Sequence, residues 1–267
     1  MVVKDGWAVT FEVYMDESYE ERKSDVICIA GYVFKRFRAV EFSKEWVPYL
    51  RRKGLPYFHM SELAHGNGVF RGRDDCDEIA RKLITLTRKK AAYGFAVTVD
   101  QAVYNQLLHG RFQLQSAYSF ALFEAMVAVR KWMERNNHNE PTSYFFEQGH
   151  QYRADADRFM TWLFESEIVR QKYRYRTHAF LPKETPWLHP ADFLAWQWRL
   201  EAGRQNQIGR RPPRKDLEAI LRPHDMHMDY NARNLPKLRR RLEERAAEKE
   251  AALMSVHMLT DLPVKPF

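Results

Sequence analysis

The segment from residue 115 to 135, QSAYSFALFEAMVAVRKWMER, constrains the fold more than any other part of the chain. Between Gln115 and Val129 the only charged residue is Glu124. A helix on the surface of a protein carries one apolar stripe and a polar face, and this segment is too apolar over its first four turns for that pattern. It therefore predicts a helix that packs against a sheet.

Segments rich in β-branched and aromatic residues predict the strands of that sheet, and the first two are close enough in sequence to form a hairpin. The predicted strands are residues 7–15, 25–34, 91–100, 141–149 and 174–183.

Helical patterns occupy most of the remaining chain. Short helices are expected between residues 40 and 90, and a helix with Pro190 in its first turn is expected near the end of the series. The stretches 205–215 and 224–229 are expected to be loops. The other predicted helices are residues 155–169, 189–203 and 234–254.

The predicted order is three strands, helix, strand, helix, strand, helix, with a helical insertion between strands two and three. This is the plan of a ribonuclease H-like α/β fold, here with a five-stranded mixed sheet flanked by helices. The usual connections between neighbouring elements predict that the first three strands form an antiparallel meander and that the fourth strand returns parallel to the first. Asp16 and Glu147, which end those two strands, are then expected to be neighbours.

The chain length suits one large domain with an extension. We expect a ribonuclease H-like domain at 1–204 and a basic, mainly helical C-terminal extension at 205–267. Residues 201–267 hold 14 Lys+Arg against 10 Asp+Glu, which is half of the chain's net charge of +8. A net positive charge suits a polyanionic partner, but it is also found in proteins that bind no polyanion.

The sequence also gives an expectation about the compartment. No apolar run approaches the roughly 20 residues that cross a bilayer, and the first ten residues lack the apolar stretch of a secretion signal. Cys28 and Cys76 have no spacing typical of metal ligands, so free thiols are expected. These features predict a cytoplasmic protein without a membrane partner, and they leave the oligomeric state open.

Four short motifs follow one another in a specific order: YMDES, YFHMSEL, YFFEQG and LHPADFLAW. Together they resemble the bacterial and phage domain-of-unknown-function family numbered 3800 (DUF3800), a divergent branch of the ribonuclease H-like superfamily, over about residues 9–204. One departure is Tyr19, which stands where the family usually has Gly after DES. The resemblance implies a carboxylate cluster that binds a divalent metal for phosphodiester cleavage.

Asp16, Glu147 and Asp192 are the principal candidates for that cluster, as metal ligands and catalytic residues. Strand alternation separates Asp16 from Glu17, so one of this pair is expected to face the site. Each candidate also has an ordinary explanation. Asp16 suits a strand-end turn, Glu147 a solvated strand end, and Asp192 the favourable end of a helix dipole.

Glu17, Glu124 and His59 are further catalytic candidates. Glu124 is expected to be either paired in the interior or exposed to a cavity. His59 is proposed from the resemblance, whereas a lone His is more often structural.

Three carboxylates in one pocket repel one another by about 4 kcal/mol per pair at 4 Å and an effective dielectric of 20. A divalent cation relieves that repulsion, and oxygen ligands without Cys or suitably placed His favour Mg²⁺ or Mn²⁺. Mg²⁺ or Mn²⁺ is therefore the expected cofactor.

Basic residues suggest where DNA or RNA binds. Alternation in the predicted strand puts Lys172, Arg174 and Arg176 on one face, although a solvated sheet edge explains them equally well. A basic loop is the second candidate, since such residues can follow a phosphate backbone. Its residues are Arg210, Arg211, Arg214 and Lys215.

The sequence thus predicts a metal-dependent nuclease. The alternatives are a catalytically silent module that binds nucleic acid or a partner, and a hydrolase of small phosphate compounds, which the basic surface does not favour.

Overall fold

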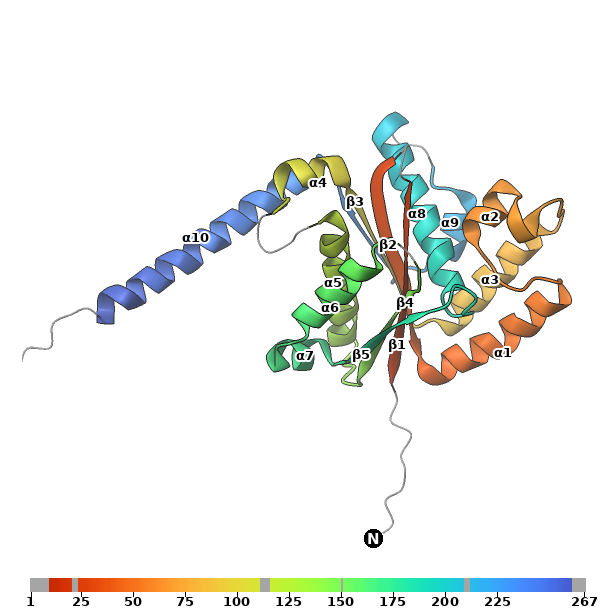
Figure 1. The fold of residues 1–267 in the computed structure, drawn as a ribbon, viewed down its shortest axis with the longest axis horizontal. Coiled ribbons are helices and arrows are strands. Elements are labelled where there is room, and N and C mark those ends of the chain that lie inside the picture. Colours follow the sequence, from red (N-terminus) through yellow and green to blue (C-terminus); the bar gives the residue numbers. More distant parts are fainter. Residues whose placement is uncertain (1–9, 21–23, 111–115, 150, 209–211, 261–267) are drawn as a thin grey trace, which may run out of the picture.

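A six-stranded mixed sheet in the order β5-β4-β1-β2-β3-β6 forms the middle layer of the protein (Figure 1). The structure is a computed structural model that describes residues 10–20, 24–110, 116–149, 151–208 and 212–260. The strands are β1 (Phe11–Glu20), β2 (Ser24–Lys35), β3 (Tyr93–Asp100), β4 (Thr142–Glu147), β5 (Tyr175–Leu181) and β6 (Met226–Tyr230).

The strand pairing confirms the topology expected from the sequence. β1, β2 and β3 form an antiparallel meander, and β4 returns parallel to β1. β5 pairs parallel to β4, and β6 pairs parallel to β3. The β1–β4 register ends with Met15 opposite Phe146, so the next residues, Asp16 and Glu147, follow on adjacent strands.

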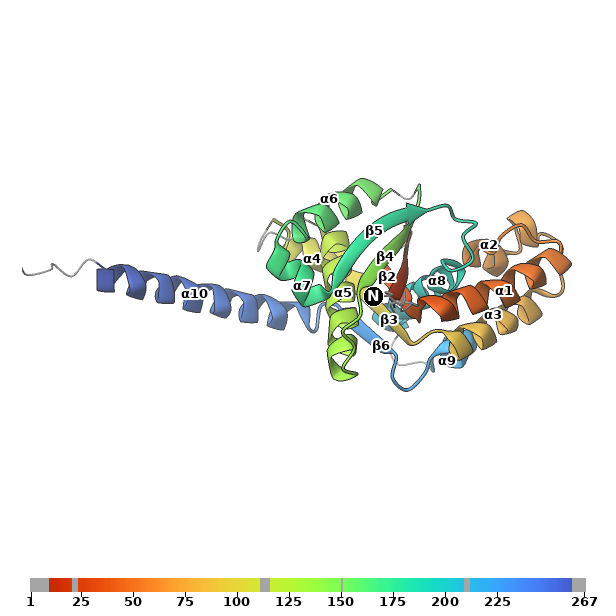
Figure 2. The ribbon, with the colours of Figure 1, turned by 90° about the horizontal axis from the view of Figure 1, so that it is seen from below.

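Helices cover both faces of the sheet (Figures 1 and 2). On one face lie α4 (Gln101–Leu107), α5 (Ala117–Arg135), α6 (Arg153–Leu163) and α7 (Glu167–Tyr173). On the other lie α1 (Arg36–Arg52), α2 (Met60–His65), the short 3₁₀ helix η1 (Gly68–Phe70), α3 (Cys76–Lys90), α8 (His189–Ile208) and α9 (Lys215–Ile220). The last helix, α10 (Leu235–Thr260), packs Leu235 against the first face and then extends away from the body of the protein.

α5 confirms the first expectation of the sequence, a helix packed on the sheet. Leu122, Ala125 and Met126 are fully buried in one cluster with β-strand residues such as Val13 and Val97. A second buried cluster lies on the other face of the sheet. The two clusters form a rigid core that fixes the positions of residues at the strand ends.

The predicted five-strand count is wrong, because residues 224–229, expected to be a bridging loop, contain most of β6. The stretch alternates polar and apolar residues, and its polar members have specific partners. The His227 ring stacks on Trp198 with centroids 3.6 Å apart, and Asp229 Oδ1 accepts a hydrogen bond from Thr98 Oγ1 at 2.7 Å. These contacts hold an edge strand where sequence spacing alone suggested a loop.

Several boundaries also differ from the sequence prediction. The helix expected at 155–169 is divided into α6 and α7, and α4 was not predicted. α8 continues to Ile208, so the expected boundary between residues 204 and 205 falls inside a helix, and the region beyond it contributes β6 to the sheet. Over the described ranges, no helix is long and apolar enough to cross a membrane.

Candidate active site

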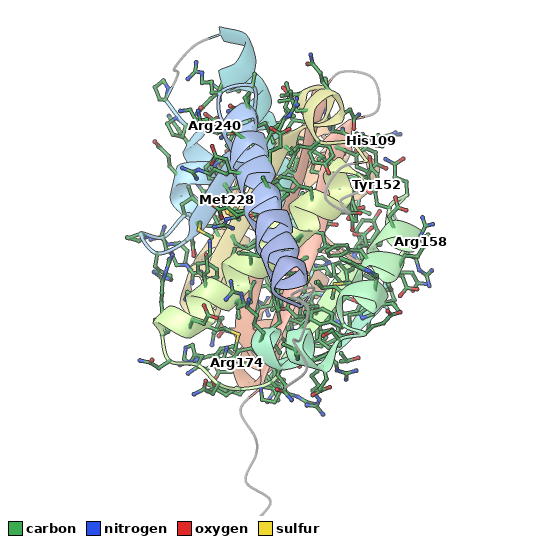
Figure 3. All side chains as sticks on the ribbon, turned by 90° about the vertical axis from the view of Figure 1, so that its left-hand side faces the viewer. His109, Tyr152, Arg158, Arg174, Met228 and Arg240 are labelled. Atoms are coloured by element: carbon green, nitrogen blue, oxygen red, sulfur yellow. The ribbon has the colours of Figure 1, made fainter. Side chains whose placement is uncertain are left out.

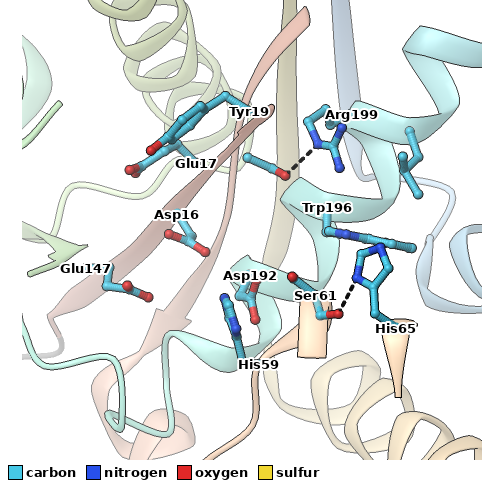
Figure 4. A pocket seen from close by; sticks show the side chains of 12 residues that line it. Asp16, Glu17, Tyr19, His59, Ser61, His65, Glu147, Asp192, Trp196 and Arg199 are labelled. Carbon is cyan, nitrogen blue, oxygen red and sulfur yellow. Dashed lines mark hydrogen bonds between the residues drawn. The ribbon is translucent and has the colours of Figure 1, made fainter. Parts of the chain in front are cut away.

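A cavity of about 530 Å³ lies beside β1, where β4 ends and α8 begins (Figure 4). Four carboxylates line it, together with side chains from α2 and α8. The lining residues are Asp16, Glu17, Ser18, Tyr19, His59, Ser61, His65, Glu147, Asp192, Trp196, Arg199 and Leu200.

Asp16 is placed by the alternation of β1. Val13 and Met15 belong to the core cluster on the α5 side, whereas Tyr14 belongs to the cluster on the α8 side. Asp16 therefore points toward α8, and only 8% of its surface is exposed. A carboxylate this deeply placed is costly for the fold unless a cation or a hydrogen bond compensates it.

Glu17 lines the same cavity as Asp16, so the expectation that only one of this pair faces the site is wrong. β1 pairs with β4 only as far as Met15. Beyond that point β4 no longer flanks β1, and side chains on both faces of the strand reach the opening. Glu147, at the end of β4, lies on the same side of the cavity as Asp16 and Glu17 (Figure 4).

Asp192 lies in the first turn of α8 and links that helix to α2. Its Oδ2 accepts a hydrogen bond of 2.7 Å from the backbone N–H of Met60, the first residue of α2. The first N–H groups of a helix have no partner inside the helix, so this carboxylate satisfies one of them. The contact holds the helical insertion beside the carboxylates.

The surroundings of Asp16 and Asp192 raise the pKa values of both acids. Burial raises the pKa of Asp16 well above its usual range, and the nearby carboxylates of Asp192, Glu17 and Glu147 raise it further. Burial also raises the pKa of Asp192 to about 6, while His59 and the Met60 N–H act in the opposite direction. Burial is the larger cause for both acids and neighbouring carboxylates add to it, and acids with raised pKa values in a cavity are typical of functional sites.

His59 also lines the cavity, as the residue directly before α2. Its Nδ1 lies 3.5 Å from Glu62 Oε1. It is the largest charge that lowers the pKa of Asp192. The position is compatible with the catalytic candidacy that the sequence resemblance suggested.

Glu124 lies outside the cavity. Its Oε2 accepts a hydrogen bond of 2.8 Å from the Tyr230 hydroxyl group, and burial raises its pKa. Of the two positions that the sequence left open, the structure shows the paired one. The carboxylate on this helix therefore fastens α5 to β6.

The predicted row of basic residues at 172–176 is wrong, because this segment is not one strand. Lys172 lies in the last turn of α7, and Arg174 ends that helix with a left-handed backbone, φ 51°. Only Arg176 belongs to β5. The backbone carbonyl of Arg174 accepts a hydrogen bond from Thr142 N–H at the start of β4, so Arg174 lies at the opposite end of that strand from Glu147. Figure 3 shows Arg174 near the lower end of the molecule.

The second basic group is only partly described. Arg210 and Arg211 lie outside the described residues. Lys215 begins α9. Arg214 packs behind the cavity wall, with its guanidinium carbon 5.0 Å from the ring centroid of Trp196.

Sequence reasoning missed the side chains that complete the cavity, chiefly Trp196, Arg199 and His65. A signal was present, since Trp196 and Arg199 follow Asp192 at spacings of four and seven residues and so share its helix face. The apolar residues around them, however, indicate only a buried helix.

No group of three or more His, Cys, Asp or Glu side chains in the described part of the chain is arranged to hold a metal ion. The donor set itself nevertheless fits a hard cation, since the carboxylates around the cavity are oxygen ligands whose charges repel one another. Side-chain rotation would have to bring them together around an ion.

No known family model matches the chain, and no curated protein is similar to it in sequence.

Proposed function

We propose that the protein is a nuclease of the ribonuclease H-like superfamily that hydrolyses phosphodiester bonds with the help of Mg²⁺ or Mn²⁺. The observation that carries the proposal is the convergence of four carboxylates from β1, β4 and α8 on one cavity, where the pKa values of Asp16 and Asp192 are raised. Acids arranged in this way destabilise the fold unless the site binds a cation.

The four motifs that resemble the numbered family support the same proposal. Asp16, His59, Glu147 and Asp192 belong to one motif each, and all four line the cavity. The strand order β5-β4-β1-β2-β3 and the parallel return of β4 suit a ribonuclease H-like topology.

Asp16, Glu147 and Asp192 would hold the metal ions. Divalent ions held by these residues would supply an activated water molecule and charge stabilisation for the leaving oxygen of a phosphodiester. The hydrogen bond from the backbone N–H of Met60 holds the Asp192 carboxylate in position for that role. His59 supplies a nearby imidazole, a group that can accept and donate a proton.

The polyanionic substrate is proposed from the net charge of +8 together with the acidic cavity. Lys and Arg side chains attract the phosphate backbone, whereas the acids take part in the chemistry. Binding and cleavage are then separable by mutation.

The test is a cleavage assay on single- and double-stranded DNA and RNA at low salt, with and without Mn²⁺. Wild type should cut at least one substrate only with metal. Asp192→Asn should lose about a thousandfold in rate while still binding, because metal ions stabilise a transition state by several kcal/mol and about 1.4 kcal/mol is tenfold.

Glu124→Gln is the matched control, since it also neutralises a partly buried acid but lies outside the cavity. Its cleavage rate should equal that of the wild type. Binding without any cleavage by wild type would replace the nuclease proposal with a catalytically silent binding module.

A further inference from the structure

The cavity has two chemically different sides, and this division supports an inference that rests on the proposed hydrolase function. Figure 4 shows Asp16, Glu17 and Glu147 on one side and His65, Trp196 and Arg199 on the other, with Asp192 between them. A site that only had to bind a metal ion would need only the carboxylates.

Arg199 is the cation of the second side. Only 7% of its surface is exposed, and its Nε donates a hydrogen bond of 2.9 Å to Ser18 Oγ on β1, which fixes the guanidinium in the wall.

A guanidinium group presents several N–H donors in a planar fork that matches phosphate oxygens. Arg199 follows Asp192 by seven residues on α8, which is about 10 Å along the helix axis. A phosphate held by Arg199 is therefore a neighbour of the one held near Asp192. Both can belong to one nucleic-acid strand that passes along α8.

Trp196 lies between these two residues on the same helix and also lines the cavity. Arg214 holds it from behind, with its guanidinium carbon 5.0 Å from the ring centroid and its Nε bonded to Gln197 Oε1 at 2.8 Å. Aromatic side chains beside cationic groups are the usual means of binding single-stranded nucleic acid, since a base packs on the ring while the phosphate meets the cation.

The depth of these residues bears on the form of the substrate. Trp196 is 7% exposed and Asp16 is 8% exposed. Bases in a duplex are covered by their stacked neighbours and by their pairing partners, so a recessed ring can contact a base only when that base is unpaired. The α2 side chains Ser61 and His65 further restrict the cavity on this side.

We propose that Arg199 and Trp196 form a subsite for an unpaired nucleotide next to the scissile phosphate, which makes single-stranded DNA or RNA the substrate. Arg199 binds the neighbouring phosphate, and Trp196 packs against the base. The carboxylate side then acts on the adjoining phosphodiester.

Binding is tested without cleavage, by fluorescence anisotropy of a labelled oligonucleotide in the presence of a chelator. Single-stranded DNA, single-stranded RNA and the matching duplexes are compared at low salt. Wild type should bind a single strand at least tenfold more tightly than its duplex, and the two single-strand arms show which sugar is preferred. Equal affinity for single strand and duplex overturns the inference without any variant.

Arg199→Gln should weaken single-strand binding by about 10- to 100-fold, the range expected for a lost charge-assisted contact. Trp196→Leu should weaken it by a similar factor. Arg81→Gln, an exposed residue on α3, is the matched control and should bind like wild type. Circular dichroism melting checks folding, and His65→Ala, which changes an exposed residue of the same wall, replaces any variant that unfolds, with an expected loss of several-fold.

A cleavage assay with Mn²⁺ separates the two proposals. Single-strand binding that depends on Arg199, without cleavage by wild type, supports the subsite and overturns the nuclease proposal. Cleavage by wild type with KM unchanged in Arg199→Gln supports the nuclease proposal and overturns the subsite.

Discussion

The carboxylates of the α1–α3 layer and those of the cavity are the same chemical groups in opposite surroundings. Lys90 Nζ lies 3.0 Å from Glu41 and 2.9 Å from Glu45. In the same layer, hydrogen bonds from Arg73 and Lys53 lower the pKa of Asp75 to about 2. In the cavity, burial and neighbouring acids raise the pKa of Asp16 and Asp192.

The difference separates acids that stabilise the fold from acids that cost stability. A carboxylate with a lowered pKa contributes stability at neutral pH, whereas one with a raised pKa reduces it. Retaining two acids with raised pKa values in one cavity is understandable if a cation binds there.

Mg²⁺ or Mn²⁺ should stabilise the wild-type protein, because a ligand that binds only the folded state adds stability. At about 100 times the dissociation constant the gain is about 2.7 kcal/mol, or roughly 5–10 °C in melting temperature. Asp192→Asn should lose most of this shift. The wild-type shift should be smaller at pH 5 than at pH 7.5. At pH 5 Asp192, with a pKa of about 6, is largely protonated and binds a cation poorly. A thermal melt that is insensitive to metal at pH 7.5 would count against the site.

Without metal, Asp192→Asn should stabilise the protein at pH 7.5 by about 3 kcal/mol, since a pKa raised by about two units to about 6 measures the cost of ionising this acid. Asn keeps an oxygen that accepts the Met60 N–H. The cost is absent below about pH 4, where the group is protonated in folded and unfolded chains, and it develops as pH rises to about 6. Urea unfolding at pH 4.5 and 7.5 should show the advantage of the variant growing with pH. A destabilised variant at pH 7.5 would contradict this account.

Asp75→Asn should have the opposite sign and lower stability by about 1 kcal/mol at pH 7, the upper range for an exposed ion pair. Its ion pairs with Arg73 and Lys53 hold the pKa low, so their contribution is present above about pH 4 and is lost as pH falls toward 2. Urea unfolding at pH 7, at low and at high salt, measures the difference. A stability unaffected by the substitution at low salt would remove the contrast between the two regions.

Glu124→Gln should raise stability at pH 7 only slightly, by less than about 0.5 kcal/mol. The substitution removes a carboxylate whose pKa is raised by burial, and the amide oxygen can still accept the Tyr230 hydrogen bond. Thermal melting with and without Mn²⁺ should give the wild-type metal response. Loss of that response would mean that α5 takes part in metal binding, contrary to its position outside the cavity.

Much of the architecture followed from residue patterns, because buried strands and an unusually apolar helix have strong local signatures. The meander, the helical insertion and the parallel return of β4 beside β1 were all predictable. β6 was not, because its polar residues find partners on Thr98 and Trp198, more than 25 residues away in the chain. Tertiary contacts of this kind leave no local pattern.

The candidate site likewise has one part that the sequence predicts and another that it does not. Strand alternation and the expected pairing of β4 with β1 were sufficient to place Asp16 beside Glu147. The contact between Asp192 and the Met60 N–H joins residues 132 positions apart, and the Arg199–Ser18 hydrogen bond joins residues 181 positions apart. Sequence spacing could not predict such pairs. The strand predicted at 174–183 is largely β5, but the strand alternation was extended back to Lys172 in error, because alternating charges suit a helix end and a strand equally well over so few residues.

The most direct test of the central claim, that the acids of the cavity form a metal site, is a crystal structure of the wild-type protein soaked in Mn²⁺, with data collected for anomalous scattering of the metal. The account predicts manganese density in the cavity, bound by Asp16, Glu147 and Asp192, and no such density in crystals of Asp192→Asn. A wild-type cavity that stays empty of manganese, or manganese bound elsewhere with these three carboxylates unmoved, would contradict it.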